Sequence, residues 1–209
     1  MKSFIPWVVA ASLALSVVSA RAADDAPDEM VRKVTDDVLT IVRQDKAIQS
    51  GDTRKAVELV ETRVLPNFDF AHMTRLAVGK DWKQATPEQK TALTQEFKTL
   101  LVRTYSNALT QYKNQQIDYK PFKGKPEDTD VVVRTEVRQP GAKPVQLDYA
   151  LERQGDAWKV YDVMVAGVSL VTNYRETFAQ EVRNGGIDGL LKSLRDKNKQ
   201  LESQVAAKK

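Results

Sequence analysis

The chain has 209 residues, a formal net charge of +4 and no cysteine, so disulfide bonds, thiol nucleophiles and cysteine-ligated metal sites are excluded. This length suits one domain, or a core with a subdomain, and allows a sizeable apolar core. The small positive excess argues against nucleic acid as a partner and permits a weak attraction to anionic membrane surfaces.

The N-terminus has the three parts of a secretory signal. Lys2 supplies the positive charge, residues 4–18 are apolar, and small residues follow at the cleavage positions. The apolar run is shorter than the roughly 20 residues that cross a bilayer. We therefore predict a cleaved signal peptide at residues 1–22, with cleavage after Ala20 as the alternative, and an exported protein formed by residues 23–209.

Helical patterns open the mature protein. Apolar residues recur at helical spacing over residues 28–49, and Asp52 is placed to cap a second helix that ends at Pro66. A short helix is expected over residues 68–78, with Gly79 as its end. These segments predict two amphipathic helices and a short third one.

The clearest helix start is at Thr86. The sequence Thr86-Pro87-Glu88-Gln89 forms a capping box with proline at the first helical position. Apolar residues then line one face as far as Tyr112, and they form a wide stripe. This pattern predicts one long helix that packs on a broad surface.

The hydrophobic period then changes from that of a helix to that of a strand. Alternation marks four strands at residues 117–120, 131–138, 145–151 and 158–165. Short connections that contain glycine join them, so the strands should pair antiparallel within a sheet at about 116–165. Each strand has one apolar face and one charged face, so one side of the sheet is expected to be exposed to solvent.

Helical periodicity returns after Gly167. Residues 169–182 and 187–201 are expected to form two helices separated by Gly185-Gly186. The order of helices, strands and helices predicts the α+β class, with a curved antiparallel sheet cupped by helices and a helical subdomain.

Groups able to carry out catalysis are few. His72 is the only histidine and has no second histidine or cysteine with which to share a metal, so we expect no metal site. The motifs of nucleophile elbows, phosphate loops and zinc proteases are absent. Asp69, Asp148 and Asp162 are the candidate bases of an enzyme alternative, but a local helix cap at Asp69 and strand positions that face solvent or cationic neighbours at the other two explain them without catalysis. We predict no catalytic residue.

Three blocks of sequence resemble one known family. They are residues 68–105, which include MTRLAVGKDWKQATPEQ at 73–89, residues 158–178, which begin WKVYDV and include GVSLV at 167–171, and GGIDGL at 185–190. These blocks, in this order, are similar to the signature of the MlaC family, also called the toluene-tolerance or Ttg2 family. The resemblance covers nearly all of the mature chain.

The resemblance implies a phospholipid carrier of the Gram-negative periplasm. Family members shuttle glycerophospholipids between an outer-membrane lipoprotein complex and an inner-membrane ABC transporter complex. Their fold is similar to the NTF2-like cone with extra helices, and the acyl tails lie in an apolar pocket between sheet and helices. On this basis we expect a monomer that is not an enzyme, with phospholipid as its cargo and no cofactor.

The physical requirements of such a carrier agree with the composition of the chain. Two acyl chains of about sixteen carbons cost about 25 kcal/mol to expose to water, at roughly 0.8 kcal/mol per methylene. A dry pocket is therefore needed, with Arg or Lys side chains near its mouth for the head group. The residues expected to line it are Leu76, Val78, Trp82, Phe97, Leu101, Tyr105, Leu109, Val133, Val137, Leu147, Tyr149, Leu151, Val165, Val168, Val171 and Tyr174.

Periodicity does not distinguish a filled core from a hollow one, so each of these residues has a plain core role as its alternative. Two other functions also remain open. One is an exported NTF2-like enzyme that uses an aspartate base on a small hydrophobic substrate. The other is a periplasmic chaperone or adaptor that binds protein segments.

Overall fold

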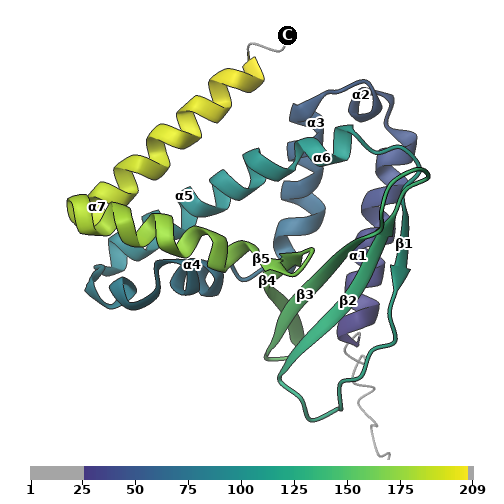
Figure 1. Cartoon of the computed structure of the whole chain (residues 1–209), viewed down its shortest axis with the longest axis horizontal. Helices are drawn as coiled ribbons and strands as arrows, with labels where there is room; N and C mark the ends of the chain where they lie inside the picture. The colour runs from purple at the N-terminus through teal and green to yellow at the C-terminus, as the bar shows by residue number, and fades with distance from the viewer. Residues whose placement is uncertain (1–25, 207–209) are drawn as a thin grey trace, which may run out of the picture.

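The computed structural model describes residues 26–206, so the predicted signal peptide lies outside the described residues. Its secondary structure is drawn in Figure 1. The helices are α1 (Pro27–Gln44), α2 (Lys46–Gln49), α3 (Thr53–Leu59), α4 (Phe70–Val78), α5 (Pro87–Tyr105), α6 (Asn107–Thr110) and α7 (Leu170–Ala206). A π-helical segment η1 (Val60–Val64) and two 3-10 segments, η2 (Leu65–Asn67) and η3 (Gly79–Gln84), connect α3, α4 and α5.

The strands form one antiparallel sheet in the order β1-β2-β3-β4-β5. They are β1 (Gln116–Tyr119), β2 (Asp130–Arg138), β3 (Val145–Gln154), β4 (Ala157–Val165) and β5 (Val168–Ser169). A register shift between Ala150 and Leu151 interrupts the β3–β4 pairing, and such bulges bend a strand and increase its twist. The predicted α+β class and curved sheet are confirmed, and the two-residue β5 is an addition to the prediction.

Within residues 26–206 the apolar core consists of three clusters. The first joins α4, α5 and α7 and includes the fully buried Phe97 and Leu190. The second joins the sheet to α1 and includes Leu151. The third joins α1, α2 and α3 around Val42 and Ile48. Figure 1 shows the corresponding division, with the sheet and α1 at one end of the molecule and α4 and α7 at the other.

The helix caps agree with the prediction, whereas two helices are shorter than predicted. Asp52 accepts hydrogen bonds from the first turn of α3, and Thr86 and Gln89 form the reciprocal capping box of α5. The helix predicted over residues 28–49 is broken at Asp45, because this residue is extended and its carboxylate caps α2. The helix predicted to reach Tyr112 is likewise divided at Ser106 into α5 and α6.

The long C-terminal helix α7 is bent at its two glycines. Gly185 and Gly186 have non-helical backbone angles, and Gly186 has a φ of 67°, which favours glycine over other residues. The two arms correspond to the two helices predicted from the sequence. The second arm is joined to α5 by the Arg103 Nη1 to Asn198 O bond of 2.6 Å. None of the described helices combines the length and the apolar composition needed to cross a bilayer.

Candidate functional site

An apolar cavity of about 390 Å³ lies between β3 and β4, the α5–α6 region and the segment from η1 to α4. Its size is within the usual range for ligand pockets, roughly 300 to 1,000 Å³. Among the residues that the structure describes, none that lines this cavity carries a charge. The lining residues are Val60, Val64, Leu65, Phe68, Phe70, Met73, Leu101, Val102, Tyr105, Ser106, Ala108, Leu109, Leu147, Tyr149, Val163, Val165 and Leu170.

A second apolar cavity, of about 220 Å³, extends the first towards α1. The two cavities share Val64, Phe68, Leu109, Leu147 and Tyr149 in their walls. The remaining wall of the second cavity comes from α1, Asn67 of η2, β1 and the middle of β4. The two cavities therefore adjoin under the inner face of the sheet, and their walls are mainly apolar.

The segment η1 explains how one wall is built. It follows α3 without a break, and its π-helical hydrogen bonding widens the last turn before Pro66. Single π turns within helices are rare and occur often at functional sites. Val60 and Val64, at its two ends, both face the first cavity. The sequence had assigned both valines to the apolar stripe of an ordinary helix.

The predicted pocket residues fall into three groups. The cavity walls contain Leu101, Tyr105, Leu109, Leu147, Tyr149 and Val165. Eight other predicted residues belong to the core clusters and line neither cavity. They are Leu76, Val78, Trp82, Phe97, Val171 and Tyr174 near α4, α5 and α7, and Val133 and Leu151 in the sheet. Val137 is half-buried on β2, where it pairs with Ile117 and Val145, and Val168 is 59 % exposed on β5.

Several wall residues were missed by the sequence analysis. They come mainly from the segment between α3 and α4 and from α1, and include Val60, Val64, Leu65, Phe68, Phe70, Met73, Met30 and Val34. The clustered aromatic residues Phe68 and Phe70 were the one available signal, since two phenylalanines beside a capping aspartate are more than a short helix needs for packing. Their rings stack with centroids 5.7 Å apart.

Comparison with known proteins identifies the family. The family model described as MlaC protein matches residues 32–196, which is most of the chain. The chain belongs to the MlaC family. This match confirms the resemblance found in the sequence blocks.

Three relatives of this MlaC-family chain are informative. The Haemophilus influenzae intermembrane phospholipid transport system binding protein MlaC is 25% identical over 173 residues, with 81% of this chain and 80% of the relative covered. The Pseudomonas putida toluene tolerance protein ttg2D is 27% identical over 183 residues, with 87% and 82% covered. A phospholipid-binding protein from Ralstonia solanacearum, solved in complex with a phospholipid, is 40% identical, has a TM-score of 0.78 and is covered over 98% of its length, against 84% of this chain.

The three aspartates that were candidate bases all have structural partners. Asp69 caps α4 by accepting from the His72 N–H at 2.8 Å, and Asp148 accepts from Gln146 Nε2 at 2.7 Å. Partial burial raises the pKa of Asp69, but the hydrogen bonds from His72 and Gln154 outweigh it and hold this pKa below its usual value. None of the three is a wall residue of the apolar cavities.

The structural role of Asp162 at the start of α7 can be tested by substitution. Its Oδ1 accepts from the backbone N–H groups of Val163 and Val171, and its Oδ2 accepts from Ser169, so the carboxylate organises the start of α7. Replacing Asp162 by Asn removes a charge favoured at a helix N-terminus and should lower the free energy of unfolding by about 1 kcal/mol. Urea denaturation measures this loss. A change in bound ligand per folded molecule, without a change in stability, would contradict the structural role.

His72 lies in a small polar cluster away from the cavity walls. Its Nδ1 is 2.9 Å from Glu152 Oε1, and its ring stacks on Tyr161 with centroids 4.6 Å apart. Asp69, His72 and Glu152 could place three ligand atoms within 4.8 Å of one another. Gln154 Nε2 donates to Asp69 Oδ2 and Glu152 Oε1, and the backbone N–H of His72 donates to Asp69 Oδ1, whereas, within the described part of the chain, the buried His72 Nδ1 makes no hydrogen bond beyond its approach to Glu152. The absence of a metal site stays a prediction.

The phenol of Tyr149 lies in the wall that the two cavities share. Burial is the main cause that raises the pKa of its phenol to about 12 from an ordinary 10.0. The unfolded chain therefore ionises first as the pH rises, so the stability contributed by neutral Tyr149 is complete below pH 10.0 and is lost towards pH 12. We expect the urea midpoint to fall over this range, and to fall less in Tyr149→Phe. If the urea midpoint falls equally with pH in wild type and Tyr149→Phe, the loss of stability arises from other titrating groups.

Proposed function

We propose that the chain is a periplasmic phospholipid carrier that holds acyl chains in the two joined apolar cavities. The observation that carries this proposal is the pair of adjoining apolar cavities under the sheet, which share wall residues such as Leu109, Leu147 and Tyr149. It is supported by the Ralstonia solanacearum protein, which was solved with a phospholipid and is 40% identical.

The chemistry of the walls suits a carrier. Acyl chains gain about 0.8 kcal/mol for each methylene removed from water, and walls made of aliphatic and aromatic side chains supply that gain without a directional bond. A cavity no more apolar than a bilayer also allows the lipid to leave again. The carrier therefore binds by area and shape, and it needs neither a cofactor nor a catalytic group.

The setting of the proposed activity follows from the predicted signal peptide and the family. We place the protein in the periplasm, as a monomer that exchanges phospholipid with an outer-membrane lipoprotein complex and an inner-membrane ABC transporter complex. The names of the Haemophilus influenzae and Pseudomonas putida relatives support transport and solvent tolerance as the biological context. Nucleic acid is not an expected partner at this charge.

The two other functions have weaker support. An aspartate-dependent enzyme would need its base in the cavity, whereas Asp69, Asp148 and Asp162 lie outside the cavity walls. A chaperone for unfolded protein would bind through a broad exposed apolar surface, whereas these apolar walls lie between sheet and helices. We therefore place phospholipid transport ahead of both.

Purification under gentle conditions tests the proposal. The full chain is exported with its own signal, purified without detergent, and analysed by lipid extraction and mass spectrometry. We expect diacyl glycerophospholipid in the purified protein, and uptake of more from vesicles after delipidation. Protein that carries no phospholipid and accepts none from vesicles would overturn the proposal.

A further inference from the structure

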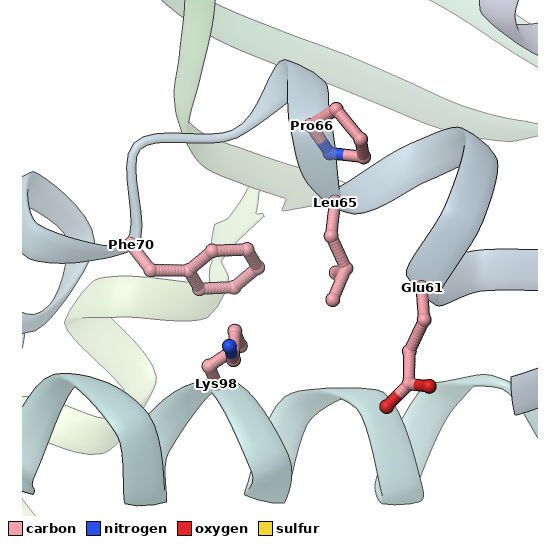
Figure 2. A pocket seen from close by; sticks show the side chains of 5 residues that line it. All are labelled: Glu61, Leu65, Pro66, Phe70 and Lys98. Carbon is pink, nitrogen blue, oxygen red and sulfur yellow. The ribbon is translucent and has the colours of Figure 1, made fainter. Parts of the chain in front are cut away.

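A surface hollow of about 400 Å³, lined by two charged and three apolar residues, lies beside the first apolar cavity. It is lined by Glu61, Leu65, Pro66, Phe70 and Lys98, whose side chains are drawn in Figure 2. Leu65 and Phe70 also belong to the wall of the apolar cavity. The hollow and the cavity therefore adjoin at these two side chains, which places a charged space next to an apolar one.

Lys98 brings a positive charge to this hollow. It lies on α5, three residues before Leu101 and four before Val102, so it occupies the same helix face as these two cavity residues. Its side chain is half-buried. Within residues 26–206 the ammonium has neither a hydrogen-bond acceptor nor an ion-pair partner. A half-buried cation without a protein partner has donors free for an anionic ligand.

Glu61 brings a negative charge to the same hollow. It follows the cavity residue Val60 in η1, and its carboxylate points towards α5 in Figure 2. It is exposed and, among the described residues, has no hydrogen bond or ion pair. Glu61 and Lys98 line one hollow but form no ion pair with each other within 4.0 Å. Each charge is thus available to an opposite charge on a ligand.

Hydrogen bonds to β4 hold the backbone of the segment from Leu65 to Phe70, which forms one wall of the hollow. Lys159 Nζ donates to the Pro66 carbonyl at 2.6 Å, and the Asp69 N–H donates to the Val160 carbonyl at 2.9 Å. These bonds fix η2 and the entry to α4 against β4. The wall formed by Leu65, Pro66 and Phe70 is therefore preorganised, which reduces the entropy lost when a ligand binds.

We infer that this hollow binds the head group of a zwitterionic glycerophospholipid with a primary ammonium, an inference that rests on the proposed carrier function. Lys98 contacts the phosphate, and Glu61 contacts the ammonium. A head group with both charges satisfies both side chains, since its own charges are held apart by a short linker. An anionic head group without an amine satisfies Lys98 alone and is repelled by Glu61. The hollow therefore selects phosphatidylethanolamine over phosphatidylglycerol.

Native mass spectrometry of the full mature chain tests this selection. Delipidated protein is incubated with vesicles of equimolar phosphatidylethanolamine and phosphatidylglycerol that have identical acyl chains, and the ratio of the two bound lipids is measured. The variants are Glu61→Gln and Lys98→Gln. Matched controls are Glu127→Gln and Lys80→Gln, which make the same charge changes at exposed positions outside the hollow and the cavities.

We expect wild type and both controls to favour phosphatidylethanolamine. Glu61→Gln should lower the ratio of phosphatidylethanolamine to phosphatidylglycerol by about threefold, the scale of one exposed charge pair. Lys98→Gln should lower the total lipid retained by a similar factor, about threefold. Ratios and totals in both variants equal to those of the controls would overturn the head-group site and leave the carrier function standing. A wild-type protein that binds neither lipid would overturn both.

Discussion

Leu147→Trp is expected to abolish most phospholipid binding while leaving the protein folded. Leu147 lies on β3 in the wall shared by the two apolar cavities. An indole at this position is expected to fill part of the space on which both cavities border. Each displaced methylene is worth about 0.8 kcal/mol, so the loss of only a few lowers the affinity by more than about tenfold. Lipid extraction and mass spectrometry measure the ratio of phospholipid to protein.

Folding is checked in the same samples. Enlarging a residue in a packed core costs about 1 to 3 kcal/mol, but a cavity wall has room for the added atoms, so the urea midpoint should change little. Ala71→Trp, at an exposed position on α4 outside both cavities, is the matched control and should retain its lipid. Leu147→Trp with undiminished phospholipid would show that the acyl chains do not lie in this space.

Local signals in the sequence were sufficient to predict most of the fold. Alternating residues on β2 become a buried face, because Val131, Val133 and Thr135 are all less than 8% exposed. The capping box at Thr86 forms as expected, since its partner Gln89 is only three residues away. The helix breaks were harder to predict, because Asp45 favours a cap only where the chain can turn, and the turn depends on packing against α3 and α6.

The cavity was only partly predictable. Leu101 and Phe97 lie on the same apolar face of α5 and have the same sequence pattern, but Leu101 lies in the cavity wall and Phe97 lies only in the core. The difference depends on which element lies opposite. Phe97 faces α7, whereas the next turn of α5 faces the space under β3 and β4. A hollow is a property of how elements meet, so the periodicity of one helix does not determine it.

The contribution of η1 was unpredictable for a similar reason. A π turn and an α turn differ by one residue per hydrogen-bonded ring, and the stripe of Val57, Val60 and Val64 is compatible with either. The choice places Val60 and Val64 in the cavity wall and Glu61 in the adjacent hollow. The apolar and polar parts of the proposed lipid site are therefore joined by a single turn of chain.

Phe97→Ala is expected to have the opposite phenotype to Leu147→Trp. Phe97 is fully buried, and its ring makes edge contacts with Tyr174 and Phe178 at centroid distances of 5.1 Å. Truncating a buried phenylalanine costs about 3 to 5 kcal/mol through lost transfer energy and the space left behind. Urea denaturation should show this loss. The ratio of phospholipid to folded protein should stay close to that of wild type, because Phe97 is not part of either cavity wall.

Val168→Ala is the control for this second experiment. Val168 was also expected to line the pocket, but it is 59 % exposed on β5, so its truncation should change the stability by less than about 0.5 kcal/mol. Leu147, Phe97 and Val168 were all predicted to line the pocket. The three variants therefore distinguish a cavity-wall residue, a core residue and a surface residue. Loss of phospholipid from folded Phe97→Ala protein would mean that the acyl chains reach the helical cluster between α5 and α7. The cavity would then have to extend beyond the space under the sheet.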